Sequence, residues 1–298
     1  MIAFFSRLLD IATLVFAVSS MLSVGFSYTV RELIEPLRNA RLVIGALVAN
    51  FVLAPLLAYA ITGFLSLGEG REVGLLLVAM AAGAPFLIKL TQAAGGDLAL
   101  ASGLLVLLVV VSIGYMPIVV PLIAPNAEVS AIAIATPLVL TMLLPLGIGL
   151  FVDAKFESWA DRLQPLMNKA SSAALVVLLV TTVVTNFGRI LSVFGTGAIL
   201  AALLFIAGAF AIGYLLGMTG RGTREELGLA TAQRNIAAAT VVATQSFADP
   251  DTLVMVVVTS VIAMVILFPI AGVLRKREQK LAETGSQRAA ARRKEPLV

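Results

Sequence analysis

The sequence contains no cysteine and no histidine. Without cysteine it has no disulfides and no thiolate metal ligands, and without histidine it lacks imidazole ligands and the commonest general base. An enzyme would have to rely on serine, lysine or carboxylate chemistry, and no phosphate loop, metal-ligand cluster or catalytic triad is recognisable. We therefore predict that the protein is not an enzyme and that it holds no metal ion and no cofactor.

Charged residues are also scarce. Only 13% of the 298 residues are charged and 60% are hydrophobic, whereas a soluble domain carries roughly 25% charged residues. The apolar residues form repeated runs of about 20 residues, the length at which a helix crosses a hydrocarbon layer of roughly 30 Å. These features predict an all-α polytopic membrane protein embedded in a lipid bilayer.

Nine apolar segments can be separated along the chain, and each is expected to be a transmembrane helix. The first has only Arg7 before it and shows no small-residue cleavage pattern, so it is interpreted as a retained span and not as a signal peptide. The segments lie at residues 8–27, 42–63, 73–94, 98–123, 129–152, 165–187, 194–217, 225–247 and 251–274.

The Lys and Arg residues on the connections are distributed unequally. Sixteen lie on one side of the predicted membrane, the tail included, and only Arg7, Arg71 and Arg189 lie on the other. Because cytoplasmic loops carry the excess of Lys and Arg, we predict an N-terminus outside and a C-terminus in the cytoplasm, in a bacterial inner membrane. The segment 275–298 alone holds eight Lys or Arg residues, and it is expected to be a disordered tail beside the anionic leaflet, with no nucleic-acid partner.

The third and eighth segments resemble each other. Arg71-Glu72-Val73-Gly74-Leu75 begins the third, Arg224-Glu225-Glu226-Leu227-Gly228-Leu229 begins the eighth, and the pairs Thr91-Gln92 and Thr244-Gln245 follow towards their ends. An odd offset in span number places the two copies in opposite orientations, as in transporters with inverted repeats. For so short a match, coincidence is the alternative.

Both of these segments are interrupted in the middle. The run 81–85 contains Gly83 and Pro85, and the run 231–235 is polar. Proline removes a helix hydrogen bond, and irregular backbone at membrane depth survives only inside protein or beside a watery cavity. Paired interruptions in two halves of a chain therefore indicate a binding site between two broken helices.

The two interrupted segments also hold the only charges found away from span ends, Lys89 and Arg234. Each costs at least about 2.5–3.5 kcal/mol at the bilayer centre unless it is solvated or paired. Lys89 could extend to the membrane surface, and Arg234 could satisfy carbonyls of the broken helix. The functional alternative is that they hold an anionic substrate, and a buried lysine can also release its proton, which would allow proton coupling. The predicted substrate-binding residues are Arg234, Asn235, Gln233, Lys89, Asn50 and Thr91.

With these features located, the chain resembles the bile acid:sodium symporter family. The resemblance is based on Met21-x3-Gly25, Asn50-x4-Pro55, the 83–91 break with the Gly96–Leu100 stretch after it, and Gln233-Arg234-Asn235. It implies two broken helices that cross, and a core domain that moves against a panel domain. The implied panel comprises residues 1–41 and 124–193, and the implied core comprises 42–123 and 194–274, followed by the tail 275–298.

The resemblance also implies two sodium sites, but this sequence departs from them. Arg234 stands where relatives have a sodium-binding amide. The other amide of that site is retained as Asn50, and the asparagine that the family has beside the second break is retained as Asn235. A slip in register could bring in Thr91 or Ser102. The other matched positions, which offer no side-chain oxygen, are Leu87, Ile88, Ala101, Leu105 and Ala230.

The leading hypothesis is therefore a sodium-independent secondary transporter of a small organic anion, with Arg234 as fixed positive charge. The alternatives are a sodium-coupled symporter of the bile-acid type and a passive anion channel.

Overall fold

The computed structural model describes residues 2–123, 130–217 and 222–292, and over these ranges the chain is helical with short connections. The all-α polytopic prediction is confirmed. Seven helices are long and apolar enough to cross a membrane, and they correspond to seven of the nine predicted segments. They are Arg7–Gly25, Ala40–Phe64, Leu98–Leu122, Ile132–Lys155, Glu157–Arg189, Ala198–Leu216 and Pro250–Arg277.

Each of the other two predicted segments consists of two short helices. The third contains α5 (Glu69–Met80) and α6 (Phe86–Ala94), and the eighth contains α12 (Thr223–Ala232) and α13 (Ile236–Ser246). The longest of these has 12 residues, or roughly 18 Å at 1.5 Å per residue, which is too short to span the bilayer alone. Both breaks fall within the predicted interruptions.

The two breaks cross each other. Ala82 and Arg234 form an isolated antiparallel bridge, and the Asn235 N–H donates to the Ala81 carbonyl oxygen at 2.8 Å. From α7 (Leu98–Ile123), the Ser112 hydroxyl donates to the Ala82 carbonyl at 2.9 Å and accepts from the Ala82 N–H at 3.2 Å. The breaks thus satisfy each other's backbone groups, as a buried interruption requires.

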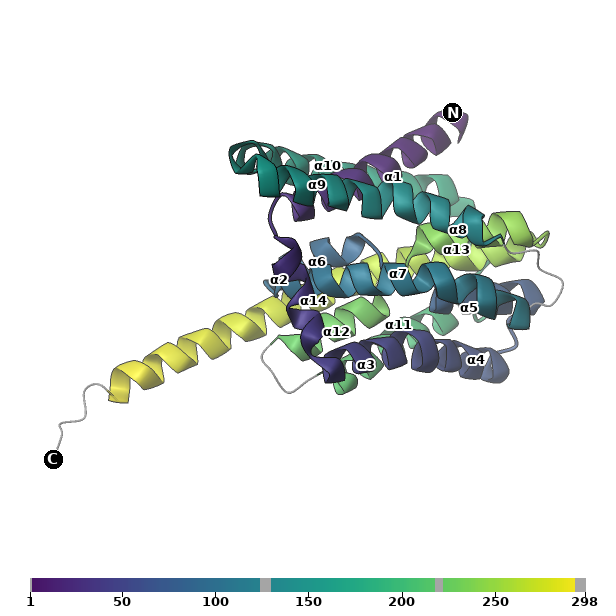
Figure 1. The fold of residues 1–298 in the computed structure, drawn as a ribbon. Coiled ribbons are helices and arrows are strands. Elements are labelled where there is room, and N and C mark those ends of the chain that lie inside the picture. The colour runs from purple at the N-terminus through teal and green to yellow at the C-terminus, as the bar shows by residue number, and fades with distance from the viewer. Residues whose placement is uncertain (1, 124–129, 218–221, 293–298) are drawn as a thin grey trace.

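Two groups of helices lie on either side of the connection through α2 (Val30–Ile34) (Figure 1). In one group, α1 (Ile2–Gly25) packs against α9 (Leu144–Lys155) and α10 (Glu157–Ser192). In the other, α5 packs against α13, α6 against α12, and α11 (Ala198–Leu216) against α12 and α4 (Ala54–Phe64). α14 (Pro250–Arg292) packs against α5, α6 and α11. The crossing therefore lies within the second group.

Two long helices contain a wider, π-helical turn. Ala49–Leu53 joins α3 (Ala40–Val48) to α4, and Val139–Leu143 joins α8 (Ala131–Leu138) to α9. Pro55, just after the first turn, has no N–H to offer the Phe51 carbonyl, and the Tyr115 hydroxyl donates to that carbonyl at 2.7 Å instead. Such turns are frequent at functional sites, and this one contains Asn50.

One prediction is wrong over most of its length. The segment after Arg275 was expected to be disordered, but α14 continues as a helix to Arg292 and projects away from the bundle (Figure 1). The physical reason is the composition of the stretch, which is rich in Ala, Glu, Gln, Lys and Arg, all strong helix formers. A helix already nucleated inside the membrane extends through such residues. Residues 293–298 lie outside the described ranges.

Ion pairs and close contacts group the connections by membrane side. Arg71 pairs with Asp251 at 2.7 Å, and Gly70 packs against Asp249, so the α4–α5 and α13–α14 connections share one side. Glu225 lies 3.9 Å from Arg277, so the start of α12 and the basic stretch of α14 share one side as well. This grouping agrees with the alternation of nine segments, while the predicted orientation stays a prediction.

The orientation can be tested with two conservative cysteine substitutions. Ser66 and Ser158 are exposed, and the chain has no native cysteine. We expect Ser158→Cys to react with a membrane-impermeant maleimide only from the cytoplasmic side, and Ser66→Cys only from the outside. Labelling of both from one side would contradict the topology.

Gly83 permits the close approach of the crossing to α7. Its φ is +78°, and a Cβ there would lie 2.6 Å from the backbone nitrogen of Val109. We expect Gly83→Ala to lower the stability of the folded protein by roughly 2–5 kcal/mol, because it adds backbone strain and overpacking. The matched control is Gly147→Ala, where a Cβ meets nothing within 4 Å. Thermal unfolding in detergent should show a large loss for the first variant and none for the second, and equal unfolding temperatures would refute the assignment.

Candidate functional site

Arg234 lies at the crossing with much of its hydrogen-bonding capacity unused. Its side chain is 2% exposed, and its Nη1 donates to the Asn50 Oδ1 at 3.1 Å. The guanidinium carbon lies 5.7 Å from the centre of the Phe205 ring, a cation–π distance. Nε and Nη2 have no hydrogen-bond partner, and no carboxylate of the described residues pairs with the guanidinium. A permanent positive charge is thus buried with two free donor groups.

Asn50 connects the second predicted segment to the second broken helix. Its Nδ2 donates to the Ala46 carbonyl at 2.9 Å and to the Thr231 hydroxyl at 3.3 Å, and its Oδ1 accepts from Arg234. The sequence left open whether Asn50 serves helix packing or a site. The amide joins two helices and also contacts the buried cation, so its role in a site stays a prediction.

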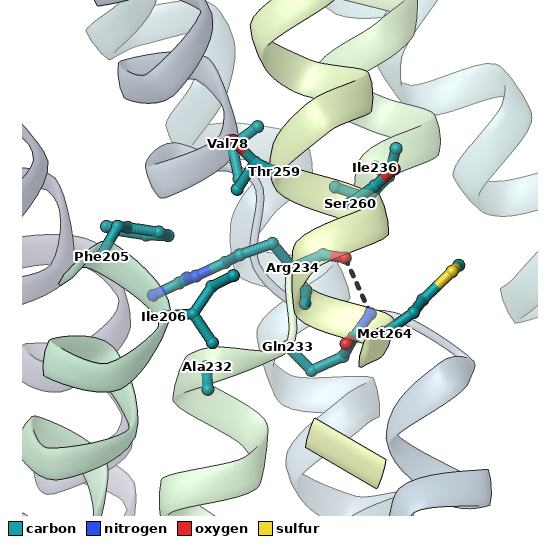
Figure 2. A pocket seen from close by; sticks show the side chains of 11 residues that line it. Val78, Phe205, Ile206, Ala232, Gln233, Arg234, Ile236, Thr259, Ser260 and Met264 are labelled. Carbon is teal, nitrogen blue, oxygen red and sulfur yellow. Dashed lines mark hydrogen bonds between the residues drawn. The ribbon is translucent and has the colours of Figure 1, made fainter. Parts of the chain in front are cut away.

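A small cavity with a mainly apolar lining adjoins Arg234 (Figure 2). It has room for roughly one water molecule. The Arg234 side chain extends toward Phe205, whereas Gln233 extends toward Met264 and donates to the Arg234 carbonyl at 3.2 Å. The Gln233 Oε1 has no partner. The cavity therefore combines free donors and a free acceptor, and its other polar lining residues are Thr259 and Ser260.

Asn235 joins the two breaks through its side chain. Its Nδ2 donates to the Gly83 carbonyl at 2.7 Å, and its Oδ1 caps α13 by accepting from the Ala238 N–H at 3.1 Å. The same amide lies 3.9 Å from the sulfur of Met142 in the other helix group. Because α6 and α13 both begin at the crossing, their N-terminal ends add partial positive charge there.

Lys89 contacts the opposite helix group. Its side chain is 7% exposed, and its Nζ donates to the Asn168 Oδ1 at 2.7 Å, the Ser172 Oγ at 3.1 Å and the Asn168 carbonyl at 3.4 Å. These three acceptors match the three hydrogens of an ammonium group. Lys89 therefore links α6 to α10, near the start of the sixth predicted segment.

Thr91 has a partner that the sequence did not indicate. Its hydroxyl donates to the Glu226 Oε2 at 2.7 Å, and Glu226 is only 1% exposed. This contact buries an acidic residue at the start of the eighth segment. Glu226 was missed because it stands at the polar start of the eighth segment, beside Glu225, and only the fold shows that the turn after α6 covers it.

The predicted residues thus fall into three places. Asn50, Gln233, Arg234 and Asn235 meet at the crossing, Lys89 lies against α10, and Thr91 lies against Glu226. The Ser102 hydroxyl, which a slip in register could have brought in, donates to its own helix at the Leu98 carbonyl. The positions matched to sodium ligands are apolar and at most 4% exposed; they are Leu87, Ile88, Ala101, Leu105 and Ala230.

Comparisons with known proteins agree with this architecture. The model described as "Sodium Bile acid symporter family" matches residues 14–193. The chain is 25% identical over 280 residues to "Probable sodium/metabolite cotransporter BASS1, chloroplastic" of Arabidopsis thaliana, covering 91% of this chain and 68% of the relative. It is also 25% identical over 252 residues to "Probable sodium/metabolite cotransporter BASS2, chloroplastic" of Oryza sativa subsp. japonica, covering 82% of this chain and 58% of that relative.

A third relative, "Probable sodium/metabolite cotransporter BASS3, chloroplastic" of Arabidopsis thaliana, is 25% identical over 195 residues, 65% of this chain and 45% of the relative. The chain thus spans between about half and two thirds of the length of these relatives. The family model covers more than half of the chain, and the resemblance inferred from the broken helices is confirmed. The chain belongs to the sodium bile acid symporter family, a family of membrane transporters and not of enzymes.

Proposed function

We propose that the protein is a secondary transporter that moves a small organic anion by alternating access, without sodium coupling, and that Arg234 is its fixed positive charge. The observation that carries the proposal is the buried guanidinium at the crossing, whose Nε and Nη2 have no hydrogen-bond partner and whose side chain lines a small cavity. A buried guanidinium with unpartnered donors raises the free energy of the folded protein unless water or an anion accepts hydrogen bonds from it. An anionic group that accepts from both nitrogens would remove that cost.

Arginine suits such a role because it keeps its charge. A guanidinium does not release its proton in proteins, and its planar donors match a carboxylate or sulfonate in a bidentate geometry. The N-terminal ends of α6 and α13 add partial positive charge at the same crossing. The C-terminal ends of α5 and α12 bring partial negative charge to the same crossing, so it is the guanidinium that favours an anion over a neutral or cationic substrate.

The motion follows from how the two helix groups meet. We assign residues 42–123 and 194–274 to a core and residues 1–41 and 124–193 to a panel. The crossing lies within the core, while Lys89 and Asn235 of the core reach Asn168 and Met142 of the panel. The cavity at Arg234 holds roughly one water, so an organic anion requires the packing at the crossing to open. The residues that line the cavity all belong to the core, so we propose that the helices around the crossing separate within the core as it moves against the panel.

Sodium independence is supported by the chemistry of the matched positions. A hard cation needs several oxygen ligands, and Leu87, Ala101 and Ala230 offer no side-chain oxygen. The guanidinium at Arg234 would also repel a cation beside it. The printed names of the relatives describe sodium/metabolite cotransporters, so a sodium-coupled symporter is the second candidate. We further propose a bacterial inner membrane location with the N-terminus outside.

The role of Arg234 is tested by neutralising it. We expect Arg234→Gln to weaken binding of carboxylates and sulfonates by about 2–5 kcal/mol, or tens- to thousands-fold, because a charged contact is lost. A thermal-shift screen of these anions on purified protein identifies ligands, and calorimetry measures their affinity. Arg234→Lys should restore binding only in part, since lysine lacks the bidentate geometry.

Arg189→Gln is the matched control, because Arg189 is exposed at the end of α10 and lies far along the sequence from the breaks. It should bind anions as the parent protein does. If Arg234→Gln is folded and binds anions equally well, the guanidinium has a purely structural role.

The coupling ion is tested separately in proteoliposomes. We expect uptake of a ligand from the screen to be unchanged when sodium is replaced by potassium at constant membrane potential. The reason is that Leu87 and Ile88 offer no side-chain oxygen at two of the matched positions, and a hard cation needs several oxygen ligands. Clear stimulation of uptake by an inward sodium gradient would favour the sodium-coupled alternative.

A further inference from the structure

Glu226 is a buried carboxyl group to which the proposed anion site assigns no role. It lies in the first turn of α12, one turn before Ala230 and two turns before the crossing. Its side chain is 1% exposed. Its Oε1 lies so close to Gly96 that a Cβ at that position would overlap it, so the turn between α6 and α7 covers the carboxyl group directly.

The carboxyl group has only one good partner. The Thr91 hydroxyl donates to Oε2 at 2.7 Å, whereas Oε1 has no hydrogen-bond partner. The backbone amide of Asp97 faces the same group. No cationic side chain of the described residues forms an ion pair with it. This arrangement disfavours a permanently ionised carboxylate, since a buried charge needs a paired charge or several donors.

The surrounding charged groups do not supply the missing cation. Asp97 and Glu225 lie near enough for their negative charges to act on Glu226. Asp97 caps α7 at the Leu100 N–H, and Glu225 lies 3.9 Å from Arg277 of α14. Arg224, in the same turn of α12, lies over the ring of Tyr214 of α11, 5.9 Å from its centre. Other ionisable groups on the elements around Glu226 are Arg275 of α14, which packs against Gly95, and Lys89 of α6, whose contacts are on α10.

We propose that Glu226 binds and releases a proton during the transport cycle, so that the carrier moves its anion together with a proton. The proposal depends on the transport function proposed above. The proton binds at Oε1, which has no partner, while Thr91 donates to Oε2. A metal cation fits this place poorly, because only two side chains, Glu226 and Thr91, contribute oxygens to the contact and hard cations need several ligands.

Release of the proton requires water to reach the carboxyl group. Glu226 is covered by the turn around Gly96 and by Thr91 of α6, and α6 also contacts α10 through Lys89. Because α6 and α12 both belong to the core, α6 has to shift against α12 to uncover Glu226, and loss of the Lys89 contact as the core moves against the panel releases α6 for this shift. In the closed arrangement the neutral, protonated form is favoured, and in the opened arrangement the proton can leave.

The same carboxyl group affects the anion site through its charge. Arg234 follows Glu226 by eight residues, or roughly 12 Å along a helix. An ionised Glu226 at that distance weakens anion binding at the guanidinium by about tenfold, for an effective dielectric constant of about 20. Binding of the proton and binding of the anion therefore favour each other, which is the linkage that a symporter needs.

Glu226 also fits this role better than Lys89, to which the sequence first pointed. All three hydrogens of the Lys89 ammonium have acceptors, so its protonated form is fully satisfied. Glu226 instead has one oxygen without a partner. Gain or loss of a proton therefore changes the hydrogen bonding of Glu226, whereas Lys89 is already fully hydrogen-bonded in its protonated form.

Infrared titration of the purified full chain tests the proton site without any substrate. We expect a band of a protonated carboxyl group that is lost at alkaline pH, is absent from Glu226→Gln, and persists in the matched control Glu225→Gln. Thr91→Val removes the donor to Oε2 and should move the band to higher frequency. This shift assigns the band to Glu226 even if Glu226→Gln fails to fold. A band that is unchanged in Glu226→Gln, or that does not respond to Thr91→Val, would overturn the assignment.

The linkage is tested with benzenesulfonate, a probe that remains ionised throughout the titration. Its affinity should fall by about tenfold from mildly acidic to alkaline pH in the parent and in Glu225→Gln, and it should be independent of pH in Glu226→Gln. The same pH dependence in Glu226→Gln refutes the linkage. If benzenesulfonate binds to no variant at any pH, the proposed anion site fails for this probe, while the infrared band still decides whether Glu226 carries the proton.

Discussion

The backbone of two interrupted helices has to be satisfied inside a membrane, and the rest of the structure depends on how this is done. Each break exposes N–H and C=O groups where lipid offers no partner. Here the breaks meet, so that Asn235 and Ala81 hydrogen-bond across them. The Ser112 hydroxyl of α7 hydrogen-bonds to both the N–H and the carbonyl of Ala82. Gly83 is needed because any side chain there would collide with the backbone of α7. The crossing can exist only while α7 stays packed against it.

The crossing also determines where charge can be placed. Two half-helices end there and two begin there, so partial charges of both signs converge on a few residues. Relatives named as sodium/metabolite cotransporters belong to the same family, and a mobile cation would be one way to balance such a site. In this chain a guanidinium is covalently attached at the same place, contacts Asn50 and Phe205, and cannot leave. We infer that replacing a mobile cation by the fixed guanidinium of Arg234 alters the ion that drives transport and leaves the fold unchanged.

The sequence predicted those features that depend on local chemistry. Both breaks were predicted from Gly83 with Pro85 and from the polar run 231–235, because no lipid-facing helix would contain them. Arg234 and Asn50 were likewise conspicuous as polar groups in apolar runs. The contacts of Thr91 with Glu226 and of Lys89 with Asn168 were not predictable, since the partners lie 135 and 79 residues apart and a carboxylate near a span end is ordinarily solvated. The helical continuation past Arg275 was missed because a basic, polar stretch was equated with disorder, although its residues are good helix formers.

A fixed cation creates an energetic problem that the proposed proton would solve. When an anion is carried by a protein whose own positive charge stays in place, one net negative charge crosses the membrane with each substrate. Against a membrane potential that is negative inside, inward movement then costs about 2.3 kcal/mol per 100 mV. Sodium removes this cost in a symporter, but Leu87, Ala101 and Ala230 offer no side-chain oxygen to a cation here. A proton bound together with a monovalent anion makes the transported load neutral. A buried carboxyl group such as Glu226, on the same half-helix that leads to Arg234, is the simplest device that could supply it.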